Sequence, residues 1–364
     1  MDTNVKKLKV NYNGQIVGYL LELDDTRIAF QYDDEWLLKG FSLNPFFLPL
    51  NNKVFISKST YFSGLFGVFY DSLPDGWGEL LVRRMVTKKR INFDKLSALT
   101  RLTLVSANGL GALQFAPVQN DNKTEKIYDL DVIAKEIKNI LNDVEEKLDI
   151  DEIFNLGGSS GGEKPKVHLR IYGQEWIVKF PAQLDPKNTG ELEYTANQVA
   201  EKSGINVNVF KLYPSKQCTG YFGAKRFDRV NGKRVHMIAL SSLLETTHKI
   251  PTLDYKHLFQ VIQEICFNQE DLYEAFRRMV FNVLYPNRDD HGKNFAFLYN
   301  ELKKGYELSP AYDLTKTPRI VEHQMTVLGE GNPKVEDLLK LSSEFNMSLK
   351  RCRDIITQVE NAIL

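Results

Sequence analysis

The sequence contains little cysteine, and its few cysteines form no recognisable pattern. Only three of its 364 residues are cysteine, namely Cys218, Cys266 and Cys352. An odd number of cysteines without metal-ligand spacing argues against both a disulfide framework and a zinc site. We therefore expect reduced thiols and a cytoplasmic protein.

The sequence also lacks net charge and long apolar runs. Its 47 Lys and Arg residues balance its 47 Asp and Glu residues, so no overall field favours nucleic acid or an anionic membrane surface. The basic run Arg83–Arg90 could form a local patch, but the solvated face of a helix is the simpler interpretation. No apolar run is long enough to span a membrane, and no signal-peptide core follows Met1. We expect no contact with a membrane.

The composition is that of a globular protein with more than one domain. Hydrophobic residues make up 43% of the chain and charged residues 26%, and a length of 364 residues suits two or three domains. Apolar residues alternate as in strands near the start and have helical spacing after about Ser241. We predict a β-rich part over residues 1–120, an α/β part with a glycine-rich loop over residues 121–243, and a helical lobe over residues 244–364.

The N-terminal part begins with a predicted hairpin. Apolar and polar residues alternate over Leu8–Tyr12 and Gln15–Leu20, and Asn13–Gly14 between them is a strong turn signal. Further along, the loop Leu73–Gly78 opens a helix and contains Trp77. Such a loop could bind a ligand, but a buried tryptophan that fastens a helix to a sheet is the simpler interpretation.

Two further segments have clear patterns. Apolar residues at helical spacing predict an amphipathic helix over Leu130–Val144. The segment Tyr221–Arg229 is predicted to form a strand that ends in alternating charge, and the turn signal Asn231–Gly232 follows it.

A glycine-rich stretch, Asn155–Lys166, directly precedes the predicted strand Val167–Ile171. Glycines let backbone amides approach a phosphate closely, but this spacing is not that of a known phosphate-binding motif, and alone it could be a flexible linker. The next strand, Trp176–Phe180, carries Lys179 among apolar neighbours. Kinases use a lysine on a strand to hold the α- and β-phosphates, although an exposed lysine at a sheet edge would fit as well.

The stretch Asn287–Asn294 carries the pattern most typical of phosphoryl transfer. It contains the pair Arg288–Asp289, and Asn294 follows the aspartate by five positions. In kinases such an aspartate accepts the proton of the substrate hydroxyl, and such an asparagine holds a metal ion. Asp and Asn are also common in loops for structural reasons, because they cap helices and form turns. The neighbouring Asp290 could replace Asp289 as proton acceptor, although only Asp289 has the spacing to Asn294.

A second aspartate, Asp313, is expected to reach the same place through a hairpin. The apolar segment Phe295–Tyr299 is a predicted strand, the polar segment Asn300–Gly305 a turn, and Tyr306–Leu308 the returning strand. This hairpin would bring Asp313 back to the end at which Asn294 lies. Two oxygen ligands would then converge, as a Mg²⁺ ion that bridges nucleotide phosphates requires.

These parts follow one another in the order of a two-lobed kinase. The order is glycine loop, strand lysine, helices, Asp-x4-Asn and second aspartate. From Leu8 to about Leu328 the sequence also resembles the HipA-like serine/threonine kinases of bacterial toxin–antitoxin modules. The resemblance implies a two-lobed, protein-kinase-like α/β (α+β) fold with a β-rich N-terminal region, a mostly helical C-terminal lobe, and ATP and Mg²⁺ bound between them. The motifs that carry it are Leu73-Pro74-Asp75-Gly76-Trp77-Gly78, Gly109-Leu110-Gly111-Ala112-Leu113, Ser159-x-x-Gly162-x-x-Pro165-Lys166, Arg226-Phe227-Asp228-Arg229, Asp289-x-His291-x-Lys293-Asn294 and Ser309-Pro310-x-Tyr312-Asp313.

The resemblance also implies roles for individual residues. Asp289 would be the catalytic base, and Asn294 and Asp313 would be the Mg²⁺ ligands. In such kinases a serine at the start of the glycine loop can be autophosphorylated, which displaces the loop, and the candidates in this sequence are Ser159 and Ser160. The residues expected to contact the nucleotide or its metal are Gly161, Gly162, Lys166, Lys179, Lys225, Phe227, His291, Lys293, Asn294, Tyr312 and Asp313.

The resemblance implies partners as well. These are a helix-turn-helix antitoxin like HipB, operator DNA reached only through that antitoxin, and a protein substrate such as an aminoacyl-tRNA synthetase or another translation factor. Two other functions fit the same residues. One is a small-molecule phosphotransferase, which would share the layout of the lobes, and the other is a non-catalytic nucleotide-binding co-repressor, which would require a dead site.

Overall fold

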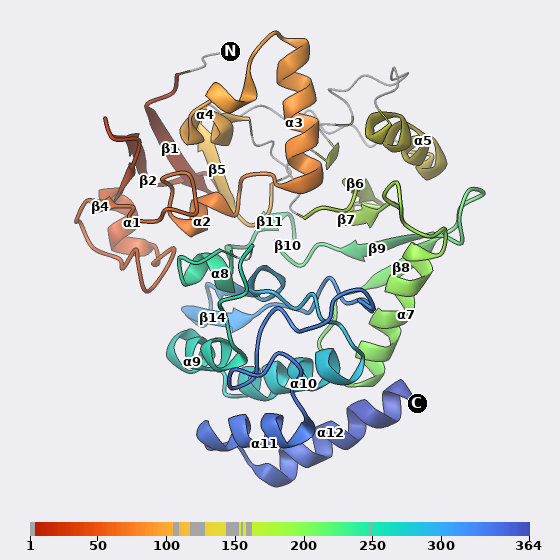
Figure 1. Ribbon diagram of the computed structural model, residues 1–364. Coiled ribbons are helices and arrows are strands. Elements are labelled where there is room, and N and C mark those ends of the chain that lie inside the picture. The colour runs from red at the N-terminus through yellow and green to blue at the C-terminus, as the bar shows by residue number, and fades with distance from the viewer. Residues whose placement is uncertain are drawn as a thin grey trace. The chain divides into compact units, whose positions relative to one another are not determined.

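The computed structural model describes residues 4–104, 109–116, 128–142, 153, 156–157, 162–247 and 249–364. The chain falls into two compact units (Figure 1). The first unit comprises Met1–Glu191 and Lys211–His236, and the second comprises Leu192–Phe210 and Met237–Leu364.

The first unit begins with an antiparallel sheet of five strands in the order β4-β3-β2-β1-β5. The predicted hairpin is confirmed, because Tyr12 pairs with Gln15, and Asn13 and Gly14 have the positive φ angles, 45° and 87°, of a type I′ turn. Side chains alternate between exposed and buried along β1, so one face of the sheet packs on the core. The elements of this part are β1 (Lys7–Tyr12), β2 (Gln15–Glu22), β3 (Ile28–Tyr32), α1 (Asp34–Lys39), β4 (Phe55–Ile56), α2 (Gly67–Tyr70), α3 (Gly76–Lys88), η1 (Phe93–Lys95), α4 (Ala98–Thr103) and β5 (Leu113–Ala116).

A second antiparallel sheet of the first unit has the strand order β6-β7-β9-β8. Trp77 and Trp176 lie in one buried cluster that joins α3 and α5 to this sheet. The predicted helix over Leu130–Val144 is observed as α5, and residues 143–144 lie outside the described part of the chain. The elements are α5 (Leu130–Leu141), β6 (Lys166–Ile171), β7 (Gln174–Lys179), β8 (Phe210–Tyr213), β9 (Tyr221–Lys225), β10 (Arg229–Val230) and β11 (Lys233–Arg234). Helix α7 (Thr189–Lys202) begins in the first unit and continues into the second.

The prediction of one strand over Tyr221–Arg229 is wrong in its second half. Strand β9 ends at Lys225, and β10 begins only at Arg229. Between them Arg226 and Asp228 turn inward and form a buried ion pair, with Nη2 and Oδ2 2.7 Å apart. Arg226 also donates to the carbonyl oxygen of Gly109, and Asp228 accepts from the amide of Gly111, so these contacts and not pairing with β7 set the backbone here.

The second unit is a small sheet covered by helices. The predicted hairpin is confirmed, because Phe297 pairs with Leu308 and Asn300 pairs with Gly305. Helix α10 contacts α9, α11 and α12, which lie around it in Figure 1. The elements are β12 (Met237–Ala239), α8 (Leu240–Leu243), α9 (Tyr255–Ile265), α10 (Glu270–Leu284), η2 (Gly292–Asn294), β13 (Ala296–Asn300), β14 (Gly305–Leu308), α11 (Val335–Glu344) and α12 (Leu349–Ile363).

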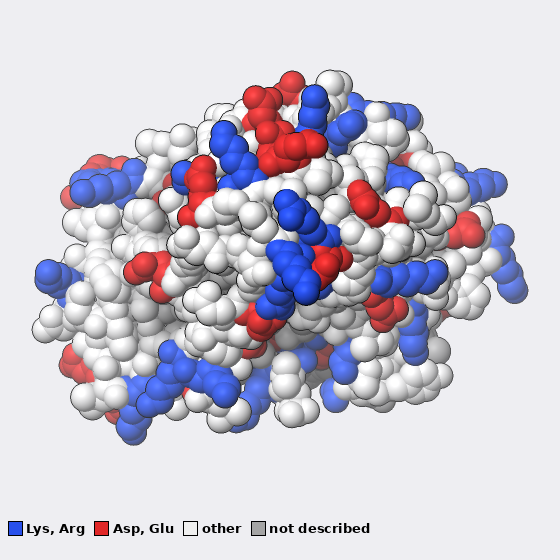
Figure 2. Space-filling model, turned by 90° about the horizontal axis from the view of Figure 1, so that it is seen from below, with Lys and Arg blue, Asp and Glu red and all other residues white. Residues whose placement is uncertain are grey.

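The surface and the thiols agree with the composition. Basic and acidic side chains are interspersed on the face that Figure 2 shows. None of the helices described by the structure combines the length and the apolar character that a membrane crossing requires. Cys218, Cys266 and Cys352 are all free thiols, as predicted.

We expect His236, at the end of the first unit, to make the stability of this unit sensitive to acid. Its side chain is fully buried, and Nε2 donates a hydrogen bond to the carbonyl oxygen of Leu43 at 3.0 Å. Burial lowers the pKa of His236 from 6.5 to about 4. The folded state therefore keeps the ring neutral, whereas the unfolded chain takes up a proton below about pH 6.5.

We expect His236 to contribute stability that is fully present above pH 6.5 and is lost as the pH falls toward 4, by about 3 kcal/mol in all. In His236→Gln the amide still donates to Leu43 but does not titrate, so the unfolding free energy should depend less on pH in this window. Urea unfolding followed by tryptophan fluorescence tests this, because Trp36, Trp77 and Trp176, the three tryptophans of the chain, all belong to the first unit. Identical pH profiles for both proteins would contradict it.

Candidate active site

The predicted catalytic loop, Asn287–Asn294, follows α10 and is fixed to that helix at its first residue. Asn287 donates from its backbone amide to the carbonyl oxygen of Asn282 at 2.9 Å. Its side-chain Nδ2 also donates to Oδ1 of Asn282 at 2.8 Å. Arg288 follows, and its amide donates to the hydroxyl of Thr317 at 2.7 Å. The loop is therefore held in one place before it reaches the two aspartates.

The two adjacent aspartates differ in exposure. The side chain of Asp289 is 49% exposed, whereas that of Asp290 is fully buried. Asp290 accepts hydrogen bonds from the Tyr255 hydroxyl at 2.7 Å and from Nδ1 of His323 at 2.8 Å. A base must come within hydrogen-bond reach of the proton that it removes. Burial excludes Asp290 from that role, and Asp289 remains the candidate.

His291 and Asn294 surround Asp289. The backbone amide of Lys293 donates to Nδ1 of His291 at 3.3 Å, so Nε2 carries the proton of the neutral ring, and it lies 3.8 Å from Oδ1 of Asp289. Nδ2 of Asn294 donates to the carbonyl oxygen of Asp289 at 2.8 Å. Because the nitrogen end of the amide is engaged in this bond, its oxygen is the end that can serve as a metal ligand.

The hairpin β13–β14 links the two predicted metal ligands. The amide of Ser309, directly after β14, donates to the carbonyl oxygen of Ala296 at 2.9 Å. The hydroxyl of Tyr312 donates to the carbonyl oxygen of Lys293 at 2.7 Å. Tyr312 directly precedes Asp313 and Lys293 directly precedes Asn294, so this bond ties the two segments together one residue before each ligand.

The ligand set fits Mg²⁺. In phosphoryl-transfer sites this ion is held by one or two protein oxygens together with phosphate and water, and Asn294 and Asp313 offer an amide oxygen and a carboxylate. Asp313 also has a φ of 55°, in the left-handed region that costs a residue with a side chain about 1–2 kcal/mol. Such strain is concentrated at functional sites. Among the described residues no group of three His, Cys, Asp or Glu could hold a metal.

In the first unit, the end of the glycine-rich loop is docked on the start of α3. Ser159, Ser160 and Gly161 lie outside the described residues, and the loop is described from Gly162 onward. The backbone amide of Gly162 donates to Oδ1 of Asp75, whose side chain does not cap α3. The carbonyl oxygen of Gly162 accepts from the amide of Trp77 at 3.2 Å. The loop Leu73–Gly78 therefore holds Gly162 in place.

Trp77 fastens the helix to the sheet, as predicted. The indole is 2% exposed, and its Nε1 donates to the carbonyl oxygen of Lys166 in β6 at 3.0 Å. At Gly157, on the other side of the loop, a Cβ would lie 2.6 Å from that same oxygen and 3.0 Å from the indole nitrogen. Glycine is required here because helix, loop and strand meet without room for a side chain.

Two lysines face each other on adjacent strands of the first unit. Lys166 of β6 pairs directly with Lys179 of β7, so the two side chains lie on the same face of the sheet. Lys166 is 7% exposed, and Nζ of Lys179 lies 5.8 Å from the ring centre of Phe222. Two basic side chains on one face of a sheet raise the local positive potential, which suits the binding of an anion such as phosphate.

Lys225 and Phe227, the residues predicted to meet the adenine, flank the end of β9. Lys225 pairs with Trp176, and the amide of Arg226 donates to the carbonyl oxygen of Glu175 at 2.8 Å. The backbone is therefore set by β7 up to Arg226. The contacts of both residues with adenine stay a prediction.

The contact between the motifs Arg226–Arg229 and Gly109–Leu113 was not predicted from the sequence. Asp228 accepts from Nε and Nη2 of Arg226 at 2.9 and 2.7 Å, and from the amide of Gly111 at 2.7 Å. Arg226 and Arg229 both donate to the carbonyl oxygen of Gly109, at 2.8 and 2.7 Å. Residues Arg226–Arg229 thus hold the segment Gly109–Gly111 in place by hydrogen bonds, and we call this set of contacts the clamp. The sequence carried no signal for this contact, because Gly109–Leu113 contains no charged residue and the two motifs lie more than a hundred residues apart.

Comparisons with known proteins identify the family and the fold. The family of the HipA-like C-terminal domain matches residues 158–364, and that of the HipA N-terminal domain matches residues 8–116. The structure of HipA from Shewanella oneidensis MR-1, solved with HipB and operator DNA, matches with a TM-score of 0.72 and 19% identity over 98% of this chain and 88% of that one. The α/β fold predicted from the sequence is confirmed by this likeness.

Two curated relatives are putative kinases of Sinorhizobium fredii (strain NBRC 101917 / NGR234). Y4dM is 29% identical over 167 residues, which cover 42% of this chain and 40% of the relative. Y4mE is 23% identical over 342 residues, which cover 86% of this chain and 78% of the relative. The C-terminal family match alone covers more than half of the sequence. The chain therefore belongs to the HipA family.

Proposed function

We propose that the protein is a serine/threonine-protein kinase of the HipA toxin type that transfers the γ-phosphoryl group of ATP. The observation that carries this proposal is the catalytic loop, which buries Asp290 and leaves the carboxylate of Asp289 half exposed beside His291 and Asn294. Phosphoryl transfer uses an accessible carboxylate beside oxygen ligands for Mg²⁺, and Asn294, together with Asp313 on the segment that Tyr312 ties to Lys293, offers such ligands.

In the proposed reaction the hydroxyl oxygen of a substrate serine or threonine bonds to the γ-phosphorus. The bond from that phosphorus to the oxygen shared with the β-phosphate breaks, and ADP leaves with the electron pair. The hydroxyl proton passes to the carboxylate of Asp289, which Nε2 of His291 would help to orient from 3.8 Å. Mg²⁺, when bound by Asn294 and Asp313, would neutralise charge on the phosphates.

In the first unit, the lysine pair and the glycine-rich loop support nucleotide binding. Lys166 and Lys179 place two positive charges on one face of the sheet. Gly162 is held by Asp75 and Trp77, and its φ of 89° is one that glycine adopts without strain. Backbone amides of such a loop can approach phosphate oxygens, so we assign ATP phosphate binding to this part of the chain.

The proposed partner is a HipB-like helix-turn-helix antitoxin. The related HipA of Shewanella oneidensis was solved together with HipB and operator DNA. This chain has equal numbers of basic and acidic residues, and it therefore lacks the net positive charge that drives direct binding to DNA. We propose that it reaches operator DNA only through the antitoxin, and that its substrate is a protein of translation such as an aminoacyl-tRNA synthetase.

Incubation with ATP and Mg²⁺, followed by intact-mass measurement and phosphosite mapping, tests the kinase. We expect added phosphate on Ser159 or Ser160, and none on these residues in the double variant Ser159→Ala/Ser160→Ala. Phosphate at this place would bring about two negative charges to a loop suited to binding phosphate, so the phosphorylated protein should bind ATP more weakly. A phosphoryl group that appears on a small metabolite and never on protein would instead support a small-molecule phosphotransferase.

A further inference from the structure

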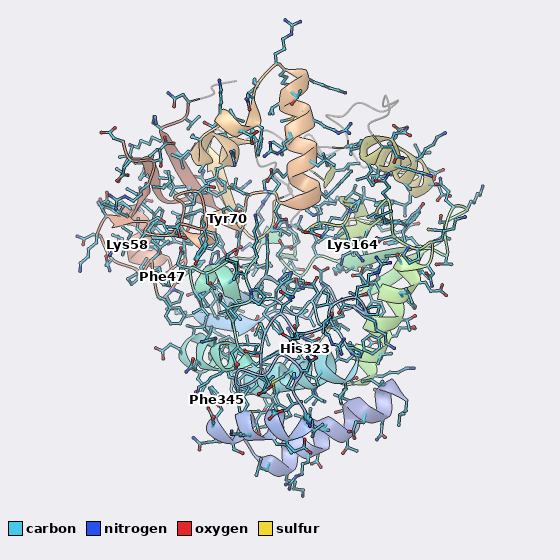
Figure 3. The ribbon with its side chains drawn as sticks, in the orientation of Figure 1. Phe47, Lys58, Tyr70, Lys164, His323 and Phe345 are labelled. Carbon is cyan, nitrogen blue, oxygen red and sulfur yellow. The ribbon has the colours of Figure 1, made fainter. Side chains whose placement is uncertain are left out.

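A buried hydrogen-bond network encloses Asp290, the residue next to the candidate base. One carboxylate oxygen, Oδ2, accepts from the Tyr255 hydroxyl at 2.7 Å and from Nδ1 of His323 at 2.8 Å. The other oxygen, Oδ1, accepts from the backbone amide of Gln324 at 2.9 Å. Asp290 is 1% and His323 (labelled in Figure 3) is 6% exposed, so the network is shielded from water.

The network continues into helix α10 and returns to the catalytic loop. Nδ2 of Asn282 donates to the hydroxyl oxygen of Tyr255 at 2.9 Å. Oδ1 of the same asparagine accepts from Nδ2 of Asn287 at 2.8 Å. Asn287 lies two residues before Asp289, and Asp290 lies directly after it. Polar contacts therefore fix the loop on both sides of the candidate base.

Stability alone is a poor explanation for this arrangement. Burial of a carboxylate is costly unless every oxygen is hydrogen-bonded, and apolar residues of similar volume often give equal stability. Directed hydrogen bonds supply orientation, which apolar packing does not. The exposed fractions of the two side chains agree with such an orienting role. The Asp290 side chain is fully buried, whereas that of its neighbour Asp289 is 49% exposed. Holding one side chain inward directs the other outward.

We propose that Asp290 is a positioning residue for phosphoryl transfer, which holds the catalytic loop so that the Asp289 carboxylate meets the substrate hydroxyl. This role rests on the proposed kinase function. Its loss would misplace the base without touching the lysines and the glycine-rich loop of the first unit. A shift of about 1 Å in a reacting group can lower the rate about 100-fold. The effect should therefore fall on kcat and spare the KM for ATP.

The variant Asp290→Asn tests this role. Its amide has nearly the same size, but an NH₂ group replaces one of the oxygens that accept from Tyr255, His323 and Gln324. We expect kcat to fall about 100-fold and the KM for ATP to change less than about 3-fold. The matched control is Val359→Ala, a fully buried residue of α12 outside the network. It should lower the melting temperature and leave kcat within about 3-fold.

A second variant, Tyr255→Phe, removes one donor to Asp290 and keeps the ring. We expect kcat to fall about 10-fold, with little further loss when it is added to Asp290→Asn, because both variants break the same contact. If Asp290→Asn folds and keeps a near-wild-type kcat, the proposed role is wrong. If Asp290→Asn does not fold, a near-wild-type kcat in Tyr255→Phe would overturn the role instead. So would a loss of kcat in Val359→Ala as large as in Asp290→Asn. If the wild-type protein transfers no phosphate, the kinase proposal itself fails.

Discussion

We expect the Asp289→Asn substitution to lower kcat for phosphoryl transfer about 1,000-fold, because an amide cannot accept the proton of the substrate hydroxyl. The side chain of Asp289 is 49% exposed, so its replacement by an amide of equal size should leave the unfolding free energy unchanged within about 0.5 kcal/mol. Binding of Mg²⁺–ATP should persist, because Asp289 is not one of the predicted metal ligands. Transfer rates at saturating ATP, together with nucleotide binding by calorimetry, check both expectations.

The matched control is Asp354→Asn, which makes the same chemical change at an exposed position on α12 of the same unit. This variant should retain the wild-type rate. Transfer by Asp289→Asn within tenfold of wild type would show that another group accepts the proton. In that case His291, 3.8 Å from Asp289, would be the next candidate. Growth arrest on expression should likewise disappear in Asp289→Asn if arrest depends on phosphoryl transfer.

Local chemistry made the turns and hairpins of this chain predictable. Asn13–Gly14 and Asn231–Gly232 adopt positive φ at both residues, because asparagine and glycine tolerate that conformation better than other residues. The same reasoning located the hairpin β13–β14 from an apolar run, a polar turn and a returning run. Once that hairpin was expected, the proximity of the Asn294 and Asp313 segments followed from its geometry, and the Tyr312–Lys293 bond agrees with it.

The choice between Asp289 and Asp290 could not be settled in the same way. Their difference in burial depends on Tyr255 and His323, which lie 35 and 33 residues away in the sequence. No local sequence pattern indicates that Tyr255 and His323 contact Asp290 and not the adjacent Asp289. The spacing to Asn294 favoured Asp289, and the network around Asp290 supplies the physical reason.

At the end of β9, by contrast, a local pattern gave a wrong prediction. A strand was predicted over Tyr221–Arg229, and the observed strand ends at Lys225. From Arg226 onward the backbone follows the ion pair with Asp228 and the contacts with Gly109 and Gly111. Tertiary contacts of buried charges outweighed local strand propensity there. A sequence alone does not show which charges will be buried.

The same clamp carries the largest stability effect that we expect in the first unit. Asp228→Asn should lower the unfolding free energy by about 3–5 kcal/mol, because it leaves the buried charges of Arg226 and Arg229 without their counter-ion. Burial alone would raise the pKa of Asp228, but the two guanidinium groups outweigh burial and hold it well below its usual range. Burial lowers the pKa of Arg229 to about 9, which still leaves it charged at neutral pH. Urea unfolding followed by tryptophan fluorescence measures the loss.

The depressed pKa of Asp228 fixes the sign of the pH dependence. Its contribution to stability is fully present above the unfolded-state pKa of about 4 and is lost as the pH falls below that value. The difference in unfolding free energy between wild type and Asp228→Asn should therefore be constant from pH 7 to pH 5 and shrink in stronger acid. The control is Asp25→Asn, which breaks an Asp–Arg pair of the same sequence separation whose side chains are 52% and 49% exposed. Solvent screens that pair, so its loss should change stability little. Equal effects at Asp25 and Asp228 would show that burial does not strengthen the clamp.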